Sequence, residues 1–243
     1  RHLPRKHQTL FFSATIDDRI KEVAYSLVHN PIRIQISPKD PVAKNVDHAV
    51  AFIEMDDKRF FLERMIRENE GSKILVFVRT KVRAERVQKA MERVGIEALT
   101  LHGDKNQEER FEALEGFRNG ICKILIATDL SARGIDVAGV KLVINYDLPD
   151  VAENYVHRVG RTGRGMEKGD AISFCASEEK TILAEIEKFL DKEIKVMEVS
   201  KAAYTLTKIL TNEAKNDWQK LINDAASEDA LWRKKNPKKN KKK

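Results

Sequence analysis

The sequence predicts an α/β fold in which a parallel β-sheet is sandwiched between helices. Apolar, strand-like segments alternate with helix-like segments from residue 48 to residue 190, as is typical of βαβ units. Continuous apolar runs at 74–78 and 124–127 favour strands that are buried on both faces. The predicted strands are 48–53, 73–78, 97–101, 123–127, 141–145 and 171–175, and the predicted helices are 58–69, 81–94, 107–119, 151–159 and 178–190.

Hydroxyl, amide and glycine residues mark the ends of these helices. Thr80 is expected to cap the helix at 81–94, and Gly95 follows its end. Asn106 and Glu109 have the spacing of a capping box at the start of the helix at 107–119, which Gly120 closes. The residues that mark the helix ends therefore agree with the predicted order of strands and helices.

The first 36 residues predict a separate strand–helix–strand piece. The strands are expected at 9–15 and 32–36, with a helix at 16–28 between them. Such a piece is too small to cover its own apolar faces. Residues 37–45 contain two prolines and two lysines and are interpreted as a linker to the main domain at 46–199.

The C-terminal part predicts a helical extension at 200–232 and a disordered basic tail at 233–243. In the extension, Trp218, Leu221, Ile222 and Ala225 form a narrow apolar stripe. Packing of this stripe on its own domain is favoured over a partner-binding helix. The tail holds eight lysines and arginines and no acid, so the chain's net charge of +7 leaves −1 for residues 1–232. Such a tail is expected to bind polyanions non-specifically.

Apolar runs and cysteines limit the class of protein. The longest uninterrupted apolar runs have five residues, at 49–53 and 74–78, which predicts no membrane span. No secretory leader is recognised at the start of the chain. Cys122 and Cys175 lie in or beside apolar strand patterns without a Cys-x-x-Cys motif. A reduced, cytoplasmic setting is therefore favoured over a disulfide or a metal site.

Polar residues follow four of the predicted strands at the point where each strand ends. They are Arg79-Thr80, His102-Gly103-Asp104, Thr128-Asp129 and Tyr146-Asp147. The carboxyl ends of parallel strands meet at one edge of a sheet, and ligands bind at that edge. Loops after strands are ordinary places for any one of these residues, so the prediction rests on their number.

The chemistry of this edge suits a nucleic-acid backbone. Thr80 starts a helix, where free amides and a hydroxyl favour phosphate, and Gly103 permits close approach of the backbone. Gln107 and Arg110 lie three residues apart on one helix face, so both can reach the same phosphodiester.

A second polar segment follows the strand at 123–127. Arg133 and Gly134 place a charged donor beside an exposed amide. Asp136 is unsuited to a phosphate and is expected to take a ribose hydroxyl instead. Loop capping is the alternative for both Asp129 and Asp136.

Three arginines near residue 160 predict a site for a polyphosphate. Arg158, Arg161 and Arg164 are spaced three residues apart, with Gly160 and Gly163 between them. Guanidinium groups carry a permanent charge and bind phosphate oxygens bidentately. Arg158 is expected on the helix at 151–159, which Gly160 should end, and the other two arginines on a mobile turn after it. The alternative is a solvated basic loop.

Taken in order, these segments resemble the DEAD-box RNA helicases of superfamily 2. Ser13-Ala14-Thr15 resembles the family's Ser-Ala-Thr motif, and residues 77–80 resemble its motif IV. Residues 107–110 resemble its Gln-x-x-Arg element. Residues 127–136 are similar to motif V and residues 157–164 to motif VI. The resemblance covers residues 9 to about 195, is most specific in the last two motifs, and points within the family to the bacterial RhlE group.

The resemblance implies a RecA-like fold and a role for each matching residue. Arg161 and Arg164 would be catalytic arginine fingers on the γ-phosphate of ATP, and Asp136 would bind its ribose with Gly134 nearby. Ser13, Thr15 and His157 would couple the two halves of the enzyme. One RNA strand would be held by its phosphates and sugars. The implied RNA-binding residues are Thr80, Gly103, Gln107, Arg110, Thr128 and Arg133.

Other motifs of the family are not found in these 243 residues. The sequence contains no Gly-x-x-x-x-Gly-Lys-Ser/Thr loop, no Asp-Glu-Ala-Asp box and no adenine-reading Gln motif. Residues 1–36 are therefore interpreted as the end of a first RecA-like domain, and residues 46–199 as the second. ATP and Mg²⁺ are the implied cofactors, with the Mg²⁺ ligands expected in the missing first domain and no metal site here.

The favoured hypothesis is a fragment of an ATP-dependent RNA helicase that closes with its first domain over ATP and unwinds short RNA duplexes. The fragment alone is expected to lack ATPase activity. The alternatives are a non-catalytic RNA-binding or annealing module and a DNA-directed superfamily 2 helicase. The sequence names no particular RNA, no ribosomal or RNA-degrading partner complex and no oligomeric state.

Overall fold

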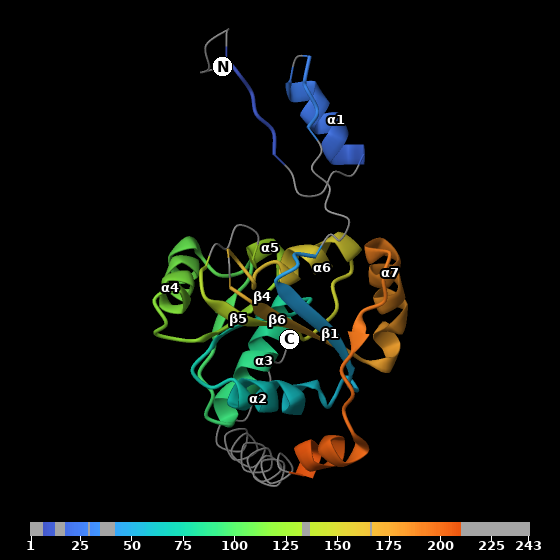
Figure 1. Cartoon of the computed structure of the whole chain (residues 1–243). Coiled ribbons are helices and arrows are strands. Elements are labelled where there is room, and N and C mark those ends of the chain that lie inside the picture. Colours follow the sequence, from blue (N-terminus) through green and yellow to red (C-terminus); the bar gives the residue numbers. More distant parts are fainter. Residues whose placement is uncertain are drawn as a thin grey trace, which may run out of the picture. The chain divides into compact units, whose positions relative to one another are not determined.

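The computed structural model describes residues 7–12, 18–28, 30–34, 42–132, 137–165 and 167–209 (Figure 1). It divides the chain into two compact units, Arg1–Pro41 and Val42–Lys243. The boundary falls inside the predicted linker at 37–45. Val42 is already part of the second unit's core, with 5% of its surface exposed.

The described part of the first unit contains one helix, α1 (Asp18–Leu27), where the sequence predicts a helix at 16–28. Residues 9–12 and 31–34, which are the described parts of the two predicted strands, form no strand. Phe12 and Ile32 are 86% and 90% exposed. A strand gains stability from hydrogen-bonded neighbours and from a covered apolar face. Within the described ranges neither segment pairs with a strand of the sheet, and the apolar side chains of Phe12 and Ile32 are left uncovered.

The second unit is built on a seven-stranded parallel sheet with the strand order β3-β4-β2-β5-β6-β1-β7. Its strands are β1 (Val46–Phe52), β2 (Lys73–Phe77), β3 (Leu99–Leu101), β4 (Ile124–Ala127), β5 (Val140–Asn145), β6 (Gly169–Cys175) and β7 (Lys195–Val196). Its helices are α2 (Lys58–Glu68), α3 (Lys81–Arg93), α4 (Gln107–Arg118), α5 (Asp129–Ala132), α6 (Ala152–Val159) and α7 (Lys180–Leu190), with a 3₁₀ turn at Ser177–Glu179. The predicted parallel sheet between helices is confirmed.

Helices cover both faces of the sheet, and each face has its own apolar core. Helices α4, α6 and α7 lie on one side of the sheet and α2 and α3 on the other (Figure 1). Side chains of the first three helices pack in one cluster, and side chains of the other two pack in the second. Along β2, Leu75 and Phe77 point into the first cluster while Ile74 and Val76 point into the second. Successive residues of a strand face opposite sides, so a continuous apolar run is what a doubly covered strand requires.

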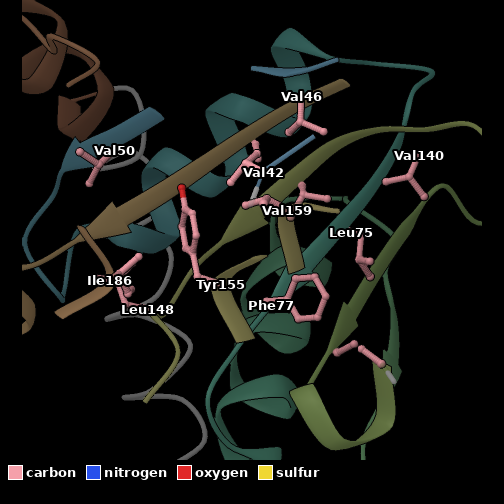
Figure 2. Packing of buried hydrophobic residues seen from close by; sticks show 14 of the residues in the cluster. Val42, Val46, Val50, Leu75, Phe77, Val140, Leu148, Tyr155, Val159 and Ile186 are labelled. Carbon is pink, nitrogen blue, oxygen red and sulfur yellow. The ribbon is translucent and has the colours of Figure 1, made fainter. Parts of the chain in front are cut away.

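Close packing on the α6 face brings β2, an interior strand of the sheet, against this helix. Leu75 and Phe77 of β2 lie near Tyr155 and Val159 of α6, with Ile186 of α7 at the same cluster (Figure 2). Tyr155 and Val159 are fully buried. The helix that precedes the arginine segment is therefore fixed to the centre of the sheet by apolar contacts.

The predicted caps are present. The Thr80 hydroxyl accepts a hydrogen bond from the Arg83 backbone amide at 3.1 Å. Asn106 and Glu109 form a reciprocal capping box, with distances of 2.9 and 2.8 Å. Gly160 is the C-cap of α6, as predicted. The sequence missed two short elements, α5 and β7, because segments of four and two residues carry no periodicity of their own.

The first part of the predicted C-terminal extension is helical and packs on its own unit. Residues 201–209 form a helix in which the Tyr204 ring lies 4.8 Å from the Phe61 ring and its hydroxyl donates to Asp57 at 2.9 Å. The apolar stripe at Trp218 to Ala225 and the basic tail lie outside the described residues. Across the part of the chain described, no helix has the length and apolar character needed to cross a membrane.

The turn after α6 is anchored where three strands begin. Thr162 donates from its hydroxyl to the carbonyl of Val140, the first residue of β5, at 2.6 Å. Val46 and Gly169, the first residues of β1 and β6, are paired in the sheet. A Cβ atom on Gly169 would collide with Thr162 Oγ1 and with the backbone nitrogen of Gly163. The turn and the start of β6 are thus in direct contact.

We expect Gly169→Ala to lower the free energy of unfolding by about 1–3 kcal/mol, because backbone atoms and a bonded threonine must move to admit the methyl group. Urea unfolding of the 243-residue chain measures this loss. Gly103→Ala is the matched control, since its added Cβ meets no atom within 4 Å and Gly103 does not need a positive φ. Equal losses in the two variants would contradict the packing described here.

Candidate nucleotide and nucleic-acid sites

Three of the predicted RNA-binding residues lie at the carboxyl ends of three neighbouring strands. Thr80 follows β2, Gly103 follows β3 and Thr128 follows β4, and these strands are adjacent in the order β3-β4-β2. The Thr128 backbone amide donates to the Leu101 carbonyl at 3.2 Å, so the ends of β3 and β4 are joined. The structure therefore places these three residues along one edge of the sheet.

The three positions differ in what they offer a ligand. Thr80 is exposed at the start of α3, although its hydroxyl already accepts the capping bond from Arg83. The space beside Gly103 is open, because a Cβ atom there would meet nothing within 4 Å. Thr128 is only 9% exposed, and its hydroxyl lies 3.5 Å from the Ser131 hydroxyl. Direct contact with a large ligand is thus easiest at the first two positions.

The start of α4 carries two more of the predicted RNA-binding residues. Gln107 is exposed at the first turn of the helix, and Arg110 follows one turn later. The Arg110 Nε atom is buried and finds no hydrogen-bond partner among the described residues. A buried N–H group without a partner costs free energy, so this guanidinium group is suited to donate to an anionic ligand.

A hydrogen bond between His102 and Glu85 fixes the end of β3 just before Gly103. His102 Nε2 lies 2.6 Å from Glu85 Oε1, and the Thr100 hydroxyl lies 3.3 Å from the same oxygen. The hydrogen bond with His102 lowers the pKa of Glu85. Sequence reasoning gave neither residue a role, because their pairing joins β3 to α3 and is visible only in the fold.

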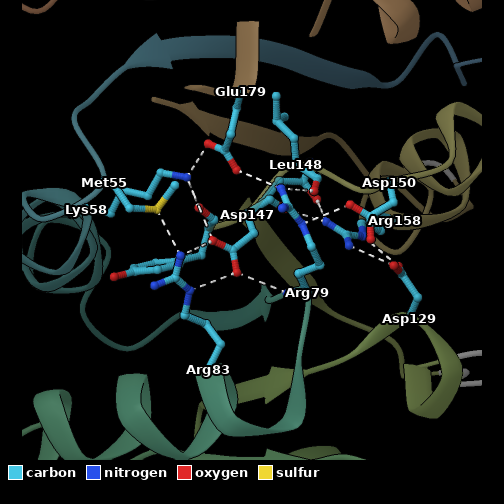
Figure 3. A network of polar contacts seen from close by, with 12 residues as sticks. Met55, Lys58, Arg79, Arg83, Asp129, Asp147, Leu148, Asp150, Arg158 and Glu179 are labelled. Atoms are coloured by element: carbon cyan, nitrogen blue, oxygen red, sulfur yellow. Dashed lines mark hydrogen bonds and ion pairs between the residues drawn. The ribbon is translucent and has the colours of Figure 1, made fainter. Parts of the chain in front are cut away.

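Arg158 does not belong to the predicted polyphosphate site. Its side chain is 1% exposed, and it donates to both carboxylate oxygens of Asp129 at 2.6 and 2.8 Å (Figure 3). It also donates to the Asp147 carbonyl at 2.7 Å. Arg158 lies on the helix, as the sequence predicts, and its guanidinium group is held by these bonds, so only Arg161 and Arg164 of the three arginines stay candidates for a polyphosphate site. Asp129, for which loop capping was the alternative, is its partner.

A second buried network lies beside Arg158 at the ends of β2 and β5. Lys58 is fully buried and donates to the Tyr146 carbonyl at 2.7 Å and to Glu179 at 2.5 Å (Figure 3). Arg79 pairs with Glu179 at 3.0 Å, and Arg83 pairs with Asp147 at 3.2 Å. Arg79 received no role from the sequence, and here it helps to neutralise a buried carboxylate.

Arg161 and Arg164 lie on the turn formed by residues 160–165, called the arginine turn below. Both side chains are half-buried, and Arg161 Nε donates to the His157 carbonyl at 3.0 Å. The turn is anchored where β1, β5 and β6 begin, whereas Thr80, Gly103 and Thr128 follow the ends of their strands. The structure thus separates the candidate ATP-contacting arginines from the candidate RNA-binding edge.

Several predicted site residues lie outside the described residues, namely Ser13, Thr15, Arg133, Gly134 and Asp136. Their implied roles in coupling, RNA binding and ribose binding stay predictions. His157 is described and lies half-buried on α6, one turn before Arg161. Among the residues that the structure does describe, no group of three or more His, Cys, Asp or Glu side chains could hold a metal ion.

Comparison with known proteins gives the same family from the sequence and from the fold. Residues 57–166 match the model of the helicase conserved C-terminal domain. The chain is 37% identical to the ATP-dependent RNA helicase DbpA of Bacillus subtilis over 198 residues, which cover 82% of the chain and 41% of the relative. It is 40% identical over 207 residues to the ATP-dependent RNA helicase RhlB of Xanthomonas oryzae, covering 84% of the chain and 36% of the relative.

The chain thus spans about two-fifths of the length of these curated relatives. Their names do not include RhlE, so placement in that group stays a prediction.

Solved structures extend the comparison to the fold. The C-terminal domain of the DEAD-box protein Dbp5 is 33% identical, with a TM-score of 0.60 over 69% of this chain and 98% of that one. Saccharomyces cerevisiae Dbp5 bound to RNA and ADP–BeF₃ is 32% identical, with a TM-score of 0.74 over 86% of this chain and 56% of that one. The chain therefore belongs to the DEAD-box family of helicases and contains its helicase conserved C-terminal domain.

Proposed function

We propose that this chain is the C-terminal RecA-like half of an ATP-dependent RNA helicase. The sheet edge at Thr80, Gly103 and Thr128, with Gln107 and Arg110 of α4, would bind the backbone of one RNA strand. The arginine turn would supply Arg161 and Arg164 to the γ-phosphate of ATP held by a first RecA-like domain. Closure of the two domains over ATP would bend the bound strand and unwind a short duplex.

The observation that carries this proposal is the different burial of the arginines around residue 160. Arg158 is buried and bonded to Asp129 inside the protein, while Arg161 and Arg164 lie on a partly exposed turn that follows the same helix. Asp129 directly follows Thr128 at the sheet edge, so Arg158 connects the proposed RNA side with the proposed ATP side. A helicase needs such a connection, because ATP hydrolysis and RNA binding must influence each other.

The described residues fit only part of an ATP molecule. Two partly exposed guanidinium groups suit the γ-phosphate, and bound ATP would supply the phosphoryl group that is transferred to water. Arg161 and Arg164 would stabilise the charge that develops on that group. Mg²⁺ would be held by ligands of the first RecA-like domain in this proposal.

A second candidate function is RNA binding or annealing driven by the basic tail, without catalysis. It is favoured by the eight lysines and arginines in residues 233–243, which bind polyanions without a folded site. A DNA-directed helicase is the third candidate. These alternatives differ in which residues carry affinity and in whether the 2′-hydroxyl group matters.

The 243-residue chain alone is expected to show no RNA-stimulated ATP turnover, because an arginine finger acts only on a nucleotide that another surface binds. Phosphate release with saturating RNA measures this. Turnover that disappears in Arg161→Ala would contradict the proposed division of the active site between two domains.

In the longer protein that carries both RecA-like domains, Arg164→Ala should lower kcat for ATP by roughly 10³-fold or more while ATP affinity changes little, because the finger acts in the transition state. Arg86→Ala, which removes an exposed arginine from α3, is the control. Normal turnover in Arg164→Ala would remove the finger assignment.

Arg110→Ala should weaken binding of single-stranded RNA about tenfold, by the loss of one charge-assisted hydrogen bond. It should also reduce the slope of log affinity against log salt by about 0.7. Fluorescence anisotropy measures both, with Arg118→Ala at the other end of α4 as the control that removes the same charge.

Two further binding measurements separate the three candidate functions. One uses the chain without residues 233–243, and the other compares RNA with single-stranded DNA of the same sequence. If the deletion removes all affinity, the tail is the binding element and the proposed RNA-binding edge is wrong. Equal affinity for RNA and DNA after the deletion would favour a DNA-directed enzyme.

A further inference from the structure

The side chain of Asn45, at the entrance to β1, lies against the arginine turn. Its Nδ2 atom is within hydrogen-bond distance of three backbone carbonyls: Gly163 O, Gly165 O at 3.3 Å and Glu167 O at 3.0 Å. Carbonyl oxygens only accept hydrogen bonds, so this environment fixes which end of the amide group faces the turn. One side chain therefore gathers three carbonyls around a single donor nitrogen.

The backbone of Asn45 also contacts the arginine turn and the start of β6. The Asn45 carbonyl accepts from the Gly169 amide at 3.0 Å, and Val46 pairs with Gly169 in the sheet. Gly163 has a φ of +63°, and a Cβ atom there would meet Val46 Cγ2 at 2.6 Å and Asn45 O at 3.0 Å. The arginine turn is thus packed directly on Asn45 and Val46.

Different contacts hold the two arginines of the turn. Arg161 is fixed by α6, because its backbone amide donates to the Arg158 carbonyl at 3.0 Å and its Nε donates to the His157 carbonyl at 3.0 Å. Arg164 lies between Gly163 and Gly165, whose carbonyls both accept from Asn45. The backbone conformation at Arg164 therefore depends on Asn45 more than that at Arg161 does.

We propose that Asn45 is a positioning residue for Arg164, an inference that rests on the proposed function of the arginine turn. It touches neither nucleotide nor RNA in this proposal and acts by holding the backbone from which the Arg164 side chain extends. A displacement of about 1 Å in a catalytic group costs roughly 10²-fold in rate, so one lost clamp is enough to be measured.

The test uses Asn45→Asp in the longer protein with both RecA-like domains. The substitution keeps the shape of the side chain but replaces the donor nitrogen by an oxygen that the three carbonyls repel. We expect kcat for ATP to fall by about 10- to 100-fold, with ATP affinity unchanged. Asn69→Asp is the matched control, because Asn69 Nδ2 also donates to a backbone carbonyl, that of Met65 at 2.9 Å, at the end of α2, which packs on the other face of the sheet from α6.

The Arg164→Ala background distinguishes positioning of Arg164 from a general loss of stability. If Asn45 acts through Arg164, adding Asn45→Asp to Arg164→Ala should change the single-turnover rate by less than about twofold, because the two effects are then not additive. If Asn45→Asp lowers the rate of the Arg164→Ala variant by the same factor as it lowers the rate of the unaltered protein, the proposal is wrong. Normal turnover in Asn45→Asp when Arg164→Ala is inactive would also overturn it. Normal turnover in Arg164→Ala would instead remove the proposed function on which this inference rests.

Hydrogen exchange on the 243-residue chain gives an independent readout that needs no activity. In Asn45→Asp, the amides of residues 163–167 should exchange faster than in the unaltered chain, whereas the amides of β5 should not. Unchanged exchange in residues 163–167 would show that Asn45 does not hold the turn and would overturn the proposal.

Discussion

The buried ion pair between Arg158 and Asp129 is the interaction on which the rest of the candidate site depends. Both carboxylate oxygens accept from one guanidinium, and the arginine also binds the Asp147 carbonyl and lies over the Phe77 ring. Removing either partner would leave a largely buried charge without compensation, which is strongly destabilising. The pair joins the end of β4, where Thr128 lies, to the helix that carries the arginine turn. Two regions at opposite ends of their strands are thereby parts of one rigid body.

A second group of buried charges lies beside this pair, and each charge in it is also compensated by a partner. Lys58 has no exposed surface, and its ammonium group is satisfied by Glu179 and by the Tyr146 carbonyl. Glu179 is also paired with Arg79, so its charge is shared between two cations. Ion pairs of this kind are weak evidence for stability, because desolvation offsets much of the attraction. Their geometric effect is clearer: they fix the ends of β2, β5 and β6 relative to α2 and α3, and the candidate RNA-binding edge is part of that frame.

The elements that sequence reasoning identified are those whose signal is local. The apolar run of β2, the cap at Thr80 and the capping box at Asn106 each depend on residues within one or two turns of the chain, and all are present. Sequence reasoning grouped Arg158 with Arg161 and Arg164 by their spacing and could not identify its partner Asp129, which lies 29 residues earlier. Lys58 and Asn45 were missed for the same reason. Their partners lie 88 to 122 residues away, and neither residue belongs to a recognisable motif.

The arginine turn illustrates how a site can be rigid without being part of the core. A finger has to be held accurately, since its effect depends on preorganisation, and it has to remain accessible to a nucleotide bound elsewhere. Burying the guanidinium groups would hold them accurately but would make them inaccessible to the nucleotide, as is the case for Arg158. Here the backbone is held instead: Thr162 is tied to the start of β5, and the carbonyls of Gly163 and Gly165 are tied to Asn45. Because these contacts hold the main chain of the turn, the side chains of Arg161 and Arg164 can stay partly exposed, which a finger that acts on a nucleotide bound by another domain requires.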